Sequence, residues 1–174
     1  CHWDRPRTNT YLFVGELTAY KRADLAVEAC TRLNLPLWVI GTGAEEARLR
    51  KRAGPTVEIL GWRSDQEVRE RMAQAKALLF PGEEDFGITP VEAMASGCPV
   101  IAYGKGGVLD TVVDRRSGVY FHEPAVESLA AALEQFEHGI KDLWSPGELR
   151  RHAEQFDRPI FQKKLREFLG KYLE

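Results

Sequence analysis

The sequence predicts an α/β domain built on a doubly wound, parallel sheet of about six strands, which is a Rossmann-like arrangement. Short apolar runs alternate with segments of helical periodicity over most of the chain. The runs are nearly continuous in apolar residues, as expected for strands that are covered on both faces. At 174 residues, the chain is long enough to bury the core of one such domain.

Each predicted strand is rich in branched or aromatic side chains and is bounded by turn residues such as glycine or proline. The segments between the strands are long enough for the crossover helices that parallel strands require. The predicted strands cover residues 11–15, 36–41, 57–60, 77–81, 99–103 and 118–121.

Helices are predicted between the strands from apolar periodicity and capping residues. Asp24 is the expected N-cap of the first helix. Ser64 or Asp65 should cap the third, and Glu67 then stands at the capping-box position relative to Ser64. Gly97 should close the helix after the fourth strand. The predicted helices begin at residue 24, cover 44–52, begin at 64 or 65, and cover 89–96 and 108–113, with helical periodicity from 126 onward.

Charge and composition argue against several classes of protein. The 24 basic and 26 acidic residues give a net charge of −2, which disfavours a nucleic-acid-binding protein. No apolar run approaches the ~20 residues needed to span a bilayer, and a cytoplasmic location is expected. Neither a disulfide framework nor a metal site is predicted, because the cysteines and histidines are scattered: Cys1, Cys30, Cys98, His2, His122, His138 and His152.

The two ends of the chain differ from the domain of residues 11–158 between them. Residues 1–10 are polar, lack clear periodicity and do not begin with methionine, so we interpret them as a linker and the chain as a fragment or processed product. Residues 159–174 are expected to form an amphipathic C-terminal helix. We predict a core-facing stripe rather than a base-stacking platform for the aromatic residues of this region, Phe156, Phe161, Phe168 and Tyr172.

Ligands of doubly wound sheets bind outside the carboxyl ends of the strands, where the strand order reverses. In the first of these loops, Gly15 permits a tight turn, and Lys21 and Arg22 either meet an anion or form a solvated basic pair. After the second strand, Glu46 stands where the third glycine of a dinucleotide fingerprint belongs, which disfavours a dehydrogenase. The candidate loops are residues 15–22, 41–45, 61–63, 81–89 and 103–107.

The stretch EEDFGITPVE, residues 83–92, follows the fourth strand and is the strongest candidate site. Gly87, Ile88 and Thr89 should present free backbone N–H groups at a helix start, which favour an anion. Glu84 precedes that start. Glu92 lies about one turn inside the helix, where a carboxylate can accept hydrogen bonds from vicinal hydroxyls. The alternative is that the acids before the helix complement its dipole and Glu92 is solvated, which fits poorly with the small, apolar surroundings of Glu92.

The stretch YGKGG follows the fifth strand. Gly106 and Gly107 are expected to start another helix with free N–H groups. Lys105 is either a phosphate contact or a surface lysine, and Asp110 is either a cap or a ligand contact.

These residues resemble a known family. EDFGITPVE, from Glu84 to Glu92, is similar to the E-x7-E motif of the retaining family-four glycosyltransferases, which have the GT-B fold. VGELTAYKRADLAVEA, VIGTGAE, VEILGW and PVIAYGKGGVLDTV stand around it in the family's order. The chain thus resembles the C-terminal donor-binding domain, one half of a GT-B fold. It looks most like bacterial GDP-mannose-dependent mannosyltransferases of polysaccharide or glycan assembly.

The resemblance implies a role for each candidate residue. Glu84 would contact the transferred sugar and Lys21 would neutralise the leaving nucleoside diphosphate, as the two catalytic residues. Glu92 would bind the ribose hydroxyls. No metal or other cofactor is implied, because helix N–H groups and a lysine would stabilise the diphosphate. The remaining implied donor contacts are Gly15, Arg22, Phe86, Gly87, Ile88, Thr89, Gly106 and Gly107, with Gly61 and Trp62 bordering the base.

The resemblance also implies partners. These are a sugar nucleotide and a glycan or lipid-linked acceptor, the latter bound through an N-terminal domain that this chain lacks. The full-length protein would associate peripherally with the inner face of the membrane. The isolated piece would bind donor weakly and transfer nothing, and its final helix would cross toward the missing domain and leave an apolar patch.

One position departs from the family pattern. The family usually has arginine after the first-strand glycine, and this chain has Glu16. Three interpretations follow: Arg22 takes over the lost charge, Glu16 orients Lys21, or the site is degraded. Two other functions remain alternatives: a non-catalytic sugar-nucleotide-binding module, which Glu16 favours, and a sugar-nucleotide epimerase on the same fold, which EDFGITPVE disfavours.

Overall fold

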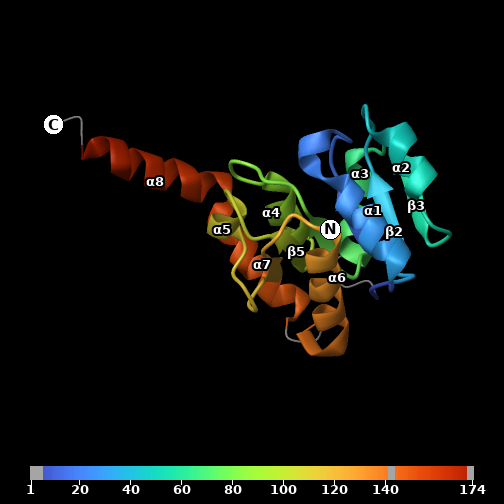
Figure 1. The fold of residues 1–174 in the computed structure, drawn as a ribbon. Coiled ribbons are helices and arrows are strands. Elements are labelled where there is room, and N and C mark those ends of the chain that lie inside the picture. The colour runs from blue at the N-terminus through green and yellow to red at the C-terminus, as the bar shows by residue number, and fades with distance from the viewer. Residues whose placement is uncertain (1–5, 141–143, 172–174) are drawn as a thin grey trace.

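A parallel sheet of six strands forms the centre of the molecule, as a computed structural model describes it for residues 6–140 and 144–171 (Figure 1). Its order is β3-β2-β1-β4-β5-β6, and every described pairing is parallel. The predicted Rossmann-like fold is therefore confirmed, and the order reverses between β1 and β4. The strands are β1 (Tyr11–Val14), β2 (Leu37–Ile40), β3 (Val57–Gly61), β4 (Leu78–Phe80), β5 (Val100–Tyr103) and β6 (Gly118–Phe121).

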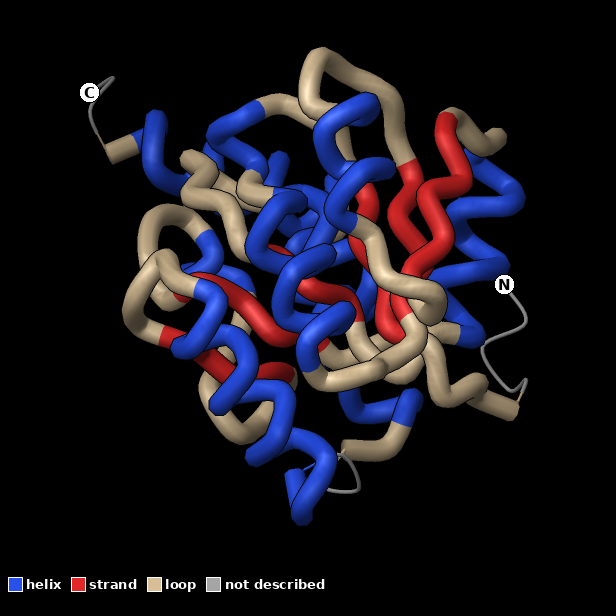
Figure 2. Tube along the Cα trace, turned by 45° about the vertical axis from the view of Figure 1, so that its right-hand side comes forward, coloured by secondary structure: helices blue, strands red, loops and turns tan. Residues whose placement is uncertain are grey.

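Helices cover both faces of this sheet (Figure 2). The segment Phe136–Ile140 continues α6 with a kink at Gly139, where the backbone is not helical. Short 3₁₀ turns lie at Ala19–Lys21 and Glu154–Phe156. The α-helices are α1 (Ala23–Arg32), α2 (Glu46–Arg52), α3 (Asp65–Gln74), α4 (Ile88–Ala95), α5 (Val108–Thr111), α6 (Val126–Gln135), α7 (Pro146–Ala153) and α8 (Arg158–Gly170).

Two apolar cores, one on each face, explain why the strands are nearly continuous in apolar residues. Successive side chains of a strand point to opposite faces. Tyr11 and Phe13 of β1 accordingly join the core that includes α1 and α6, and Leu12 joins the core that includes Met94 of α4. Because both faces are buried, every position of β1 except its last can be apolar and fully covered.

The predicted cap of α3 is confirmed, and the predicted cap of α1 is wrong. Ser64 caps α3 and forms the predicted capping box with Glu67. Asp24, in contrast, does not cap α1: the N-cap is Arg22, with a left-handed φ of 55°, and Asp24 lies in the first turn. The Asp24 carboxylate accepts hydrogen bonds from the Arg22 guanidinium instead, with an Oδ1–Nε distance of 3.1 Å.

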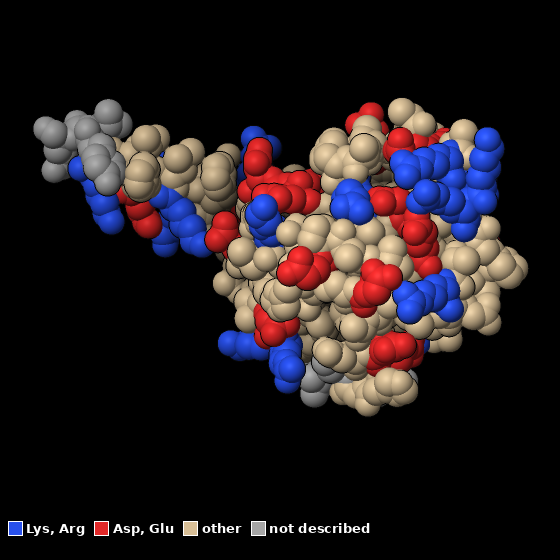
Figure 3. All heavy atoms as spheres, in the orientation of Figure 1, with Lys and Arg blue, Asp and Glu red and all other residues tan. Residues whose placement is uncertain are grey.

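The predicted core-facing aromatic stripe is wrong for the last helix. Helix α8 projects from the body, with basic side chains along one side and uncharged surface along the other (Figures 1 and 3). Phe161 and Phe168 are 60% and 57% exposed, because no described element of the sheet packs against this helix. Phe156 differs, since its ring contacts Phe86 edge to face at 6.2 Å. Tyr172 lies outside the described residues.

The ends of β1 and β2 approach each other so closely that glycine is required. A Cβ atom at Gly41, where φ is 140°, would lie 1.8 Å from the carbonyl oxygen of Gly15. We expect Gly41→Ala to lower the free energy of unfolding by about 3 kcal/mol or more, because the loop after β1 must move. Gly61→Ala is the matched control: its φ is 71° but nothing lies within 4 Å of the added atom. It should cost about 1 kcal/mol. Urea denaturation of both variants tests this, and equal losses would contradict the steric explanation.

Candidate functional site

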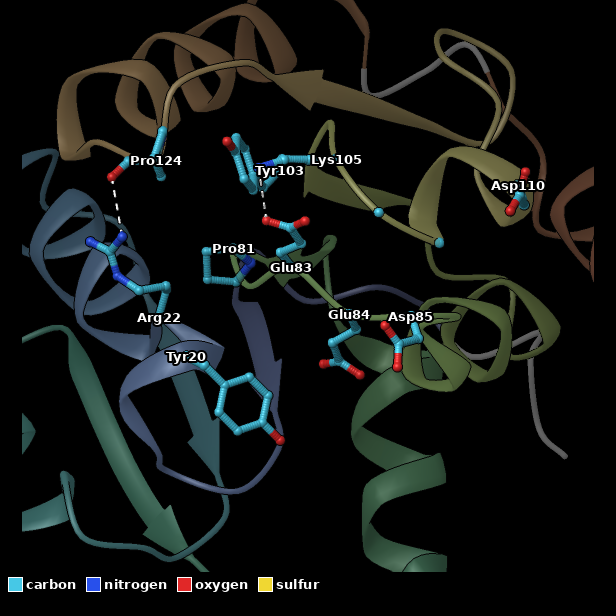
Figure 4. Close-up of a pocket in the computed structure, with 12 residues that line it drawn as sticks. Tyr20, Arg22, Pro81, Glu83, Glu84, Asp85, Tyr103, Lys105, Asp110 and Pro124 are labelled. Atoms are coloured by element: carbon cyan, nitrogen blue, oxygen red, sulfur yellow. Dashed lines mark hydrogen bonds and ion pairs between the residues drawn. The ribbon is translucent and has the colours of Figure 1, made fainter.

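The loops after β1, β4 and β5 surround a hollow of about 820 Å³ at the point where the strand order reverses (Figure 4). This is where the strand-end rule places a ligand site. More acidic than basic side chains line it. It is lined by Tyr20, Arg22, Pro81, Glu83, Glu84, Asp85, Tyr103, Lys105, Gly106, Gly107, Asp110 and Pro124.

Lys21 and Glu84 form an ion pair across the reversal point. Lys21 ends the 3₁₀ turn after β1, and Glu84 lies in the loop after β4. The Lys21 Nζ contacts Glu84 Oε1, and each side chain is only 19% exposed. The two residues for which the sequence suggested catalytic roles therefore meet, and partial burial strengthens their attraction relative to a surface pair.

Arg22, the next residue after Lys21, already has hydrogen-bond partners for its guanidinium group. Arg22 lines the hollow, but its Nε and Nη2 lie 3.1 and 3.2 Å from the two carboxylate oxygens of Asp24. Its Nη1 also donates to the carbonyl oxygen of Pro124 at 3.3 Å (Figure 4). Glu16 is exposed, and its carboxylate has no partner among the described residues. Lys21 is thus oriented by Glu84 rather than by Glu16.

Two glycines join the loops after β4 and β5. The Gly107 N–H donates to the carbonyl oxygen of Glu84 at 2.8 Å, so the prediction of a free N–H at this position is wrong. The Gly107 N–H has this partner because residues 84 and 106 pair as residues of neighbouring parallel strands do. A Cβ atom at Gly107 would lie 2.1 Å from the carbonyl oxygen of Asp85. These glycines therefore position the Glu84 loop.

Helix α4 begins beside that loop with no side-chain cap. Its N-cap is Gly87, with a left-handed φ of 75°, and no acidic residue lies in its first turn. The prediction that the helix starts at Thr89 is one residue late, because Ile88 is already helical. The first N–H groups of an α-helix have no partner within the helix, so this end can receive an anion. Glu84 does not cap it, since its carboxylate binds Lys21.

Glu92 lies on the exposed side of α4. Pro90, Ala93 and Met94 form the buried side, so the argument that the surroundings of Glu92 are too apolar for an exposed charge was wrong. The pKa of Glu92 is raised, mainly by partial desolvation and then by the Asp65 carboxylate at the start of α3. The Glu92 carboxylate thus lies near the start of α3.

The loop after β3 presents an aromatic side chain. Trp62 is 72% exposed, next to Gly61, whose φ of 71° turns the chain out of β3. Phe86 and Ile88 are also exposed, at 46% and 63%. Trp62 and Gly61 thus stand at the end of β3 and Glu92 on the exposed side of α4, while Glu84 of the Lys21–Glu84 pair precedes the first turn of α4.

Several residues that line the hollow were missed. Glu83 pairs with Lys105 at 3.2 Å, and this contact raises the pKa of Lys105 (Figure 4). Tyr20 and Tyr103 add aromatic walls. Pro124 comes from the loop after β6, and the strand-end rule, applied to the sixth strand as to the others, would have found it.

The described residues also give information on metal sites and on membrane-spanning helices. Among residues 6–140 and 144–171, no three His, Cys, Asp or Glu side chains gather in a way that could hold a metal ion. Within the same ranges, no helix is long and apolar enough to cross a bilayer.

Comparison with known proteins gives a consistent result. The family model described as "Glycosyl transferases group 1" matches residues 4–154. A GDP-mannose-dependent alpha-mannosyltransferase of Mycobacterium tuberculosis is 33% identical over 131 residues, which cover 75% of this chain and 32% of that protein. A D-inositol 3-phosphate glycosyltransferase of Corynebacterium aurimucosum is 30% identical over 167 residues, covering 86% of this chain and 40% of that protein.

The fold has solved counterparts. The Anabaena protein HepE, solved in complex with UDP and glucose, superimposes with a TM-score of 0.80 at 20% identity. The match covers 94% of this chain and 48% of HepE. This chain thus spans about a third of the Mycobacterium tuberculosis relative and about half of HepE.

Proposed function

Because this chain belongs to the group 1 glycosyl transferases, we propose that it is a donor-binding domain, which holds a sugar nucleotide while the complete enzyme transfers a hexose. The acceptor would be a glycan or a lipid-linked sugar bound outside this chain. The observation that carries the proposal is the half-buried Lys21–Glu84 pair beside the uncapped start of α4. A lysine and free N–H groups suit a diphosphate, and a carboxylate suits sugar hydroxyls.

The proposed donor lies along α4. Its diphosphate rests on the N–H groups of Gly87, Ile88 and Thr89, with Gly15 permitting the turn that brings Lys21 close. The ribose hydroxyls donate to Glu92. The base lies against Gly61 and Trp62, and the sugar projects into the hollow toward Glu84.

Binding then requires an exchange of partners. In the structure, Lys21 and Glu84 neutralise each other. A donor offers each a substitute: phosphate oxygens for Lys21 and sugar hydroxyls for Glu84. The exchange brings the ammonium group to the oxygen on which charge develops when the sugar–phosphate bond breaks, where electrostatic stabilisation is most effective.

The proposed reaction retains configuration and needs no metal ion. The bond between the anomeric carbon and the diphosphate breaks, and the acceptor oxygen forms its bond on the same face through a state with oxocarbenium character. The acceptor proton passes to the departing diphosphate. Lys21 and the α4 N–H groups supply the positive charge for this step.

The donor that we propose is GDP-mannose, and the transferred sugar is mannose. The mycobacterial relative is described as GDP-mannose-dependent, and mouse ALG2, 35% identical over 96 residues, as an alpha-1,3/1,6-mannosyltransferase. Titration calorimetry with GDP, UDP, ADP, NAD and GDP-mannose tests both levels of the proposal. Binding of GDP-mannose that is lost in Glu92→Ala supports it. If the domain prefers UDP to GDP, only the proposed donor is wrong. If it binds NAD alone, the proposed function as a donor-binding domain is wrong.

A second candidate is a sugar-nucleotide-binding module without catalysis. The observation that favours it is Glu16, an unpaired carboxylate where relatives are expected to carry a phosphate-binding arginine. Transfer by the complete enzyme, lost in Lys21→Ala, would exclude this candidate. We expect the 174-residue chain by itself to show none.

Glu92→Gln should separate stability from binding. In the folded domain, Glu92 holds its proton more tightly than its ordinary pKa of 4.5 implies, so ionising it at pH 7 costs folding stability. The variant should therefore be as stable as the parent or slightly more stable at pH 7, by less than about 1 kcal/mol because Glu92 is exposed. This gain should vanish as the pH falls below 4.5. GDP binding should weaken about tenfold, because an amide is a poorer acceptor for two hydroxyls. Denaturation and calorimetry measure the two effects.

A further inference from the structure

A second hollow, of about 600 Å³, lies between the turn of residues 113–117 and helix α7. It shares no lining residue with the hollow at the reversal point. Its charged and aromatic lining comes from both sides: Arg115, Arg116, Trp144, Glu148, Arg151 and His152.

The turn that carries two of these arginines is held rigidly. The Ser117 N–H donates to the Val113 carbonyl oxygen at 2.9 Å, and the Val113 N–H donates to Ser117 Oγ at the same distance. The Trp144 indole N–H donates to the Arg115 carbonyl oxygen at 3.0 Å. The guanidinium groups therefore project from a fixed backbone, so less conformational freedom is lost when a ligand binds.

Arg115 adopts a backbone conformation that does not favour arginine. Its φ of 56° lies in the left-handed region, where glycine, asparagine and aspartate are preferred. Nothing in the backbone requires a long basic side chain there. An arginine in this backbone conformation therefore suggests that its side chain has a function.

The positive charge around this hollow is only partly balanced. The Glu148 carboxylate is occupied by the N-cap of α7, where Oε2 accepts from Ser145 N–H and Oγ at 2.9 and 2.8 Å. Among the described residues, Arg115 pairs only with Asp114, at 4.0 Å. Arg116 forms no ion pair or side-chain hydrogen bond with any residue in the described part of the chain.

Both ring nitrogens of the histidine in this hollow already have partners. His152 Nε2 lies 2.7 Å from the Thr111 carbonyl oxygen, which can only accept, and Nδ1 lies 3.3 Å from the Gln155 amide nitrogen, which donates. Among the described residues that line the hollow, Arg115, Arg116 and Arg151 stand against one acidic residue, Glu148, whose carboxylate is already bonded to the N-cap of α7. An anion would balance the remaining positive charge.

We propose that this hollow binds a phosphate group, gripped by Arg115, Arg116 and Arg151. The planar guanidinium fork matches phosphate oxygens in pairs, which makes arginine the residue suited to this ligand. The phosphate belongs either to a soluble phosphate ester or to a lipid headgroup, which present the same chemistry. The site is additional to the donor site, and the proposal does not depend on the donor assigned above.

Titration of the 174-residue chain with inorganic pyrophosphate, followed residue by residue by NMR, tests the proposal. We expect saturable shifts at residues 113–117 and 144–155, separate from any at 87–89. Arg116→Gln and Arg151→Gln should each weaken binding at the first set about tenfold. Arg48→Gln, which removes an exposed arginine from α2, is the control and should have no effect. No saturation at 113–117, or equal weakening by the control, would overturn the proposal.

Arg115→Gly distinguishes a binding role from a structural one. Glycine relieves the left-handed conformation, so the melting temperature should stay the same or rise while pyrophosphate binding at 113–117 falls. Retained binding in this variant would exclude Arg115 from the site. Flotation with phosphatidylglycerol vesicles separates the two sources. Vesicle binding lost in Arg116→Gln identifies a lipid headgroup, and pyrophosphate binding without vesicle binding identifies a soluble ester.

Discussion

Replacing Glu84 with glutamine is expected to tighten the binding of GDP to this domain about tenfold and to lower sugar transfer by the complete enzyme at least about 100-fold. The two effects have opposite signs because Glu84 does two things. In the structure its carboxylate forms an ion pair with Lys21, so a diphosphate must displace it from the ammonium group. In the proposed donor complex it accepts hydrogen bonds from the sugar, which GDP lacks.

Calorimetry with GDP and transfer assays on the complete enzyme measure the two effects. Glu83→Gln is the matched control, since Glu83 is the preceding residue, is half-exposed and pairs with Lys105 instead. It should change GDP binding by less than about threefold. If Glu84→Gln weakens GDP binding, the carboxylate does not compete with the diphosphate for Lys21, and the proposed exchange of partners is wrong.

Local sequence patterns were sufficient to predict the sheet. Each strand is a short apolar run, and β6 was predicted with its observed bounds, Gly118–Phe121. The Ser64 capping box was also predictable, because both partners lie within three residues of each other. These features depend on neighbouring residues alone, so no knowledge of strand order was needed.

Other features could not be predicted because they arise where distant segments meet. The Lys21–Glu84 contact spans 63 positions and exists because β1 and β4 are neighbours in the sheet. The bonded N–H of Gly107 likewise depends on the pairing of two loops. The exposed Phe161 shows the converse case: helical periodicity indicates an apolar face, but it does not say what that face packs against.

Glu16 is the position where the family resemblance and this chain differ most, and the structure narrows its interpretation. Arg22 is engaged by Asp24 and the Pro124 carbonyl, so it is poorly placed to replace a lost phosphate contact. Lys21 is oriented by Glu84. An unpaired carboxylate thus stands at the end of β1, close to the loop that carries the lysine proposed to bind diphosphate.

Glu16→Arg should therefore tighten GDP binding about tenfold, because it removes a repelling charge and adds a guanidinium group that can bind phosphate. Glu16→Gln, which only removes the charge, should give a smaller gain of about threefold. Calorimetry at two salt concentrations separates the loss of charge repulsion from the new hydrogen bonds to phosphate, since the electrostatic part of the gain in affinity should shrink as salt rises. If neither variant tightens GDP binding, the diphosphate does not approach the end of β1. The donor would then depend on α4 alone for its phosphate contacts, and Lys21 would serve only to hold Glu84.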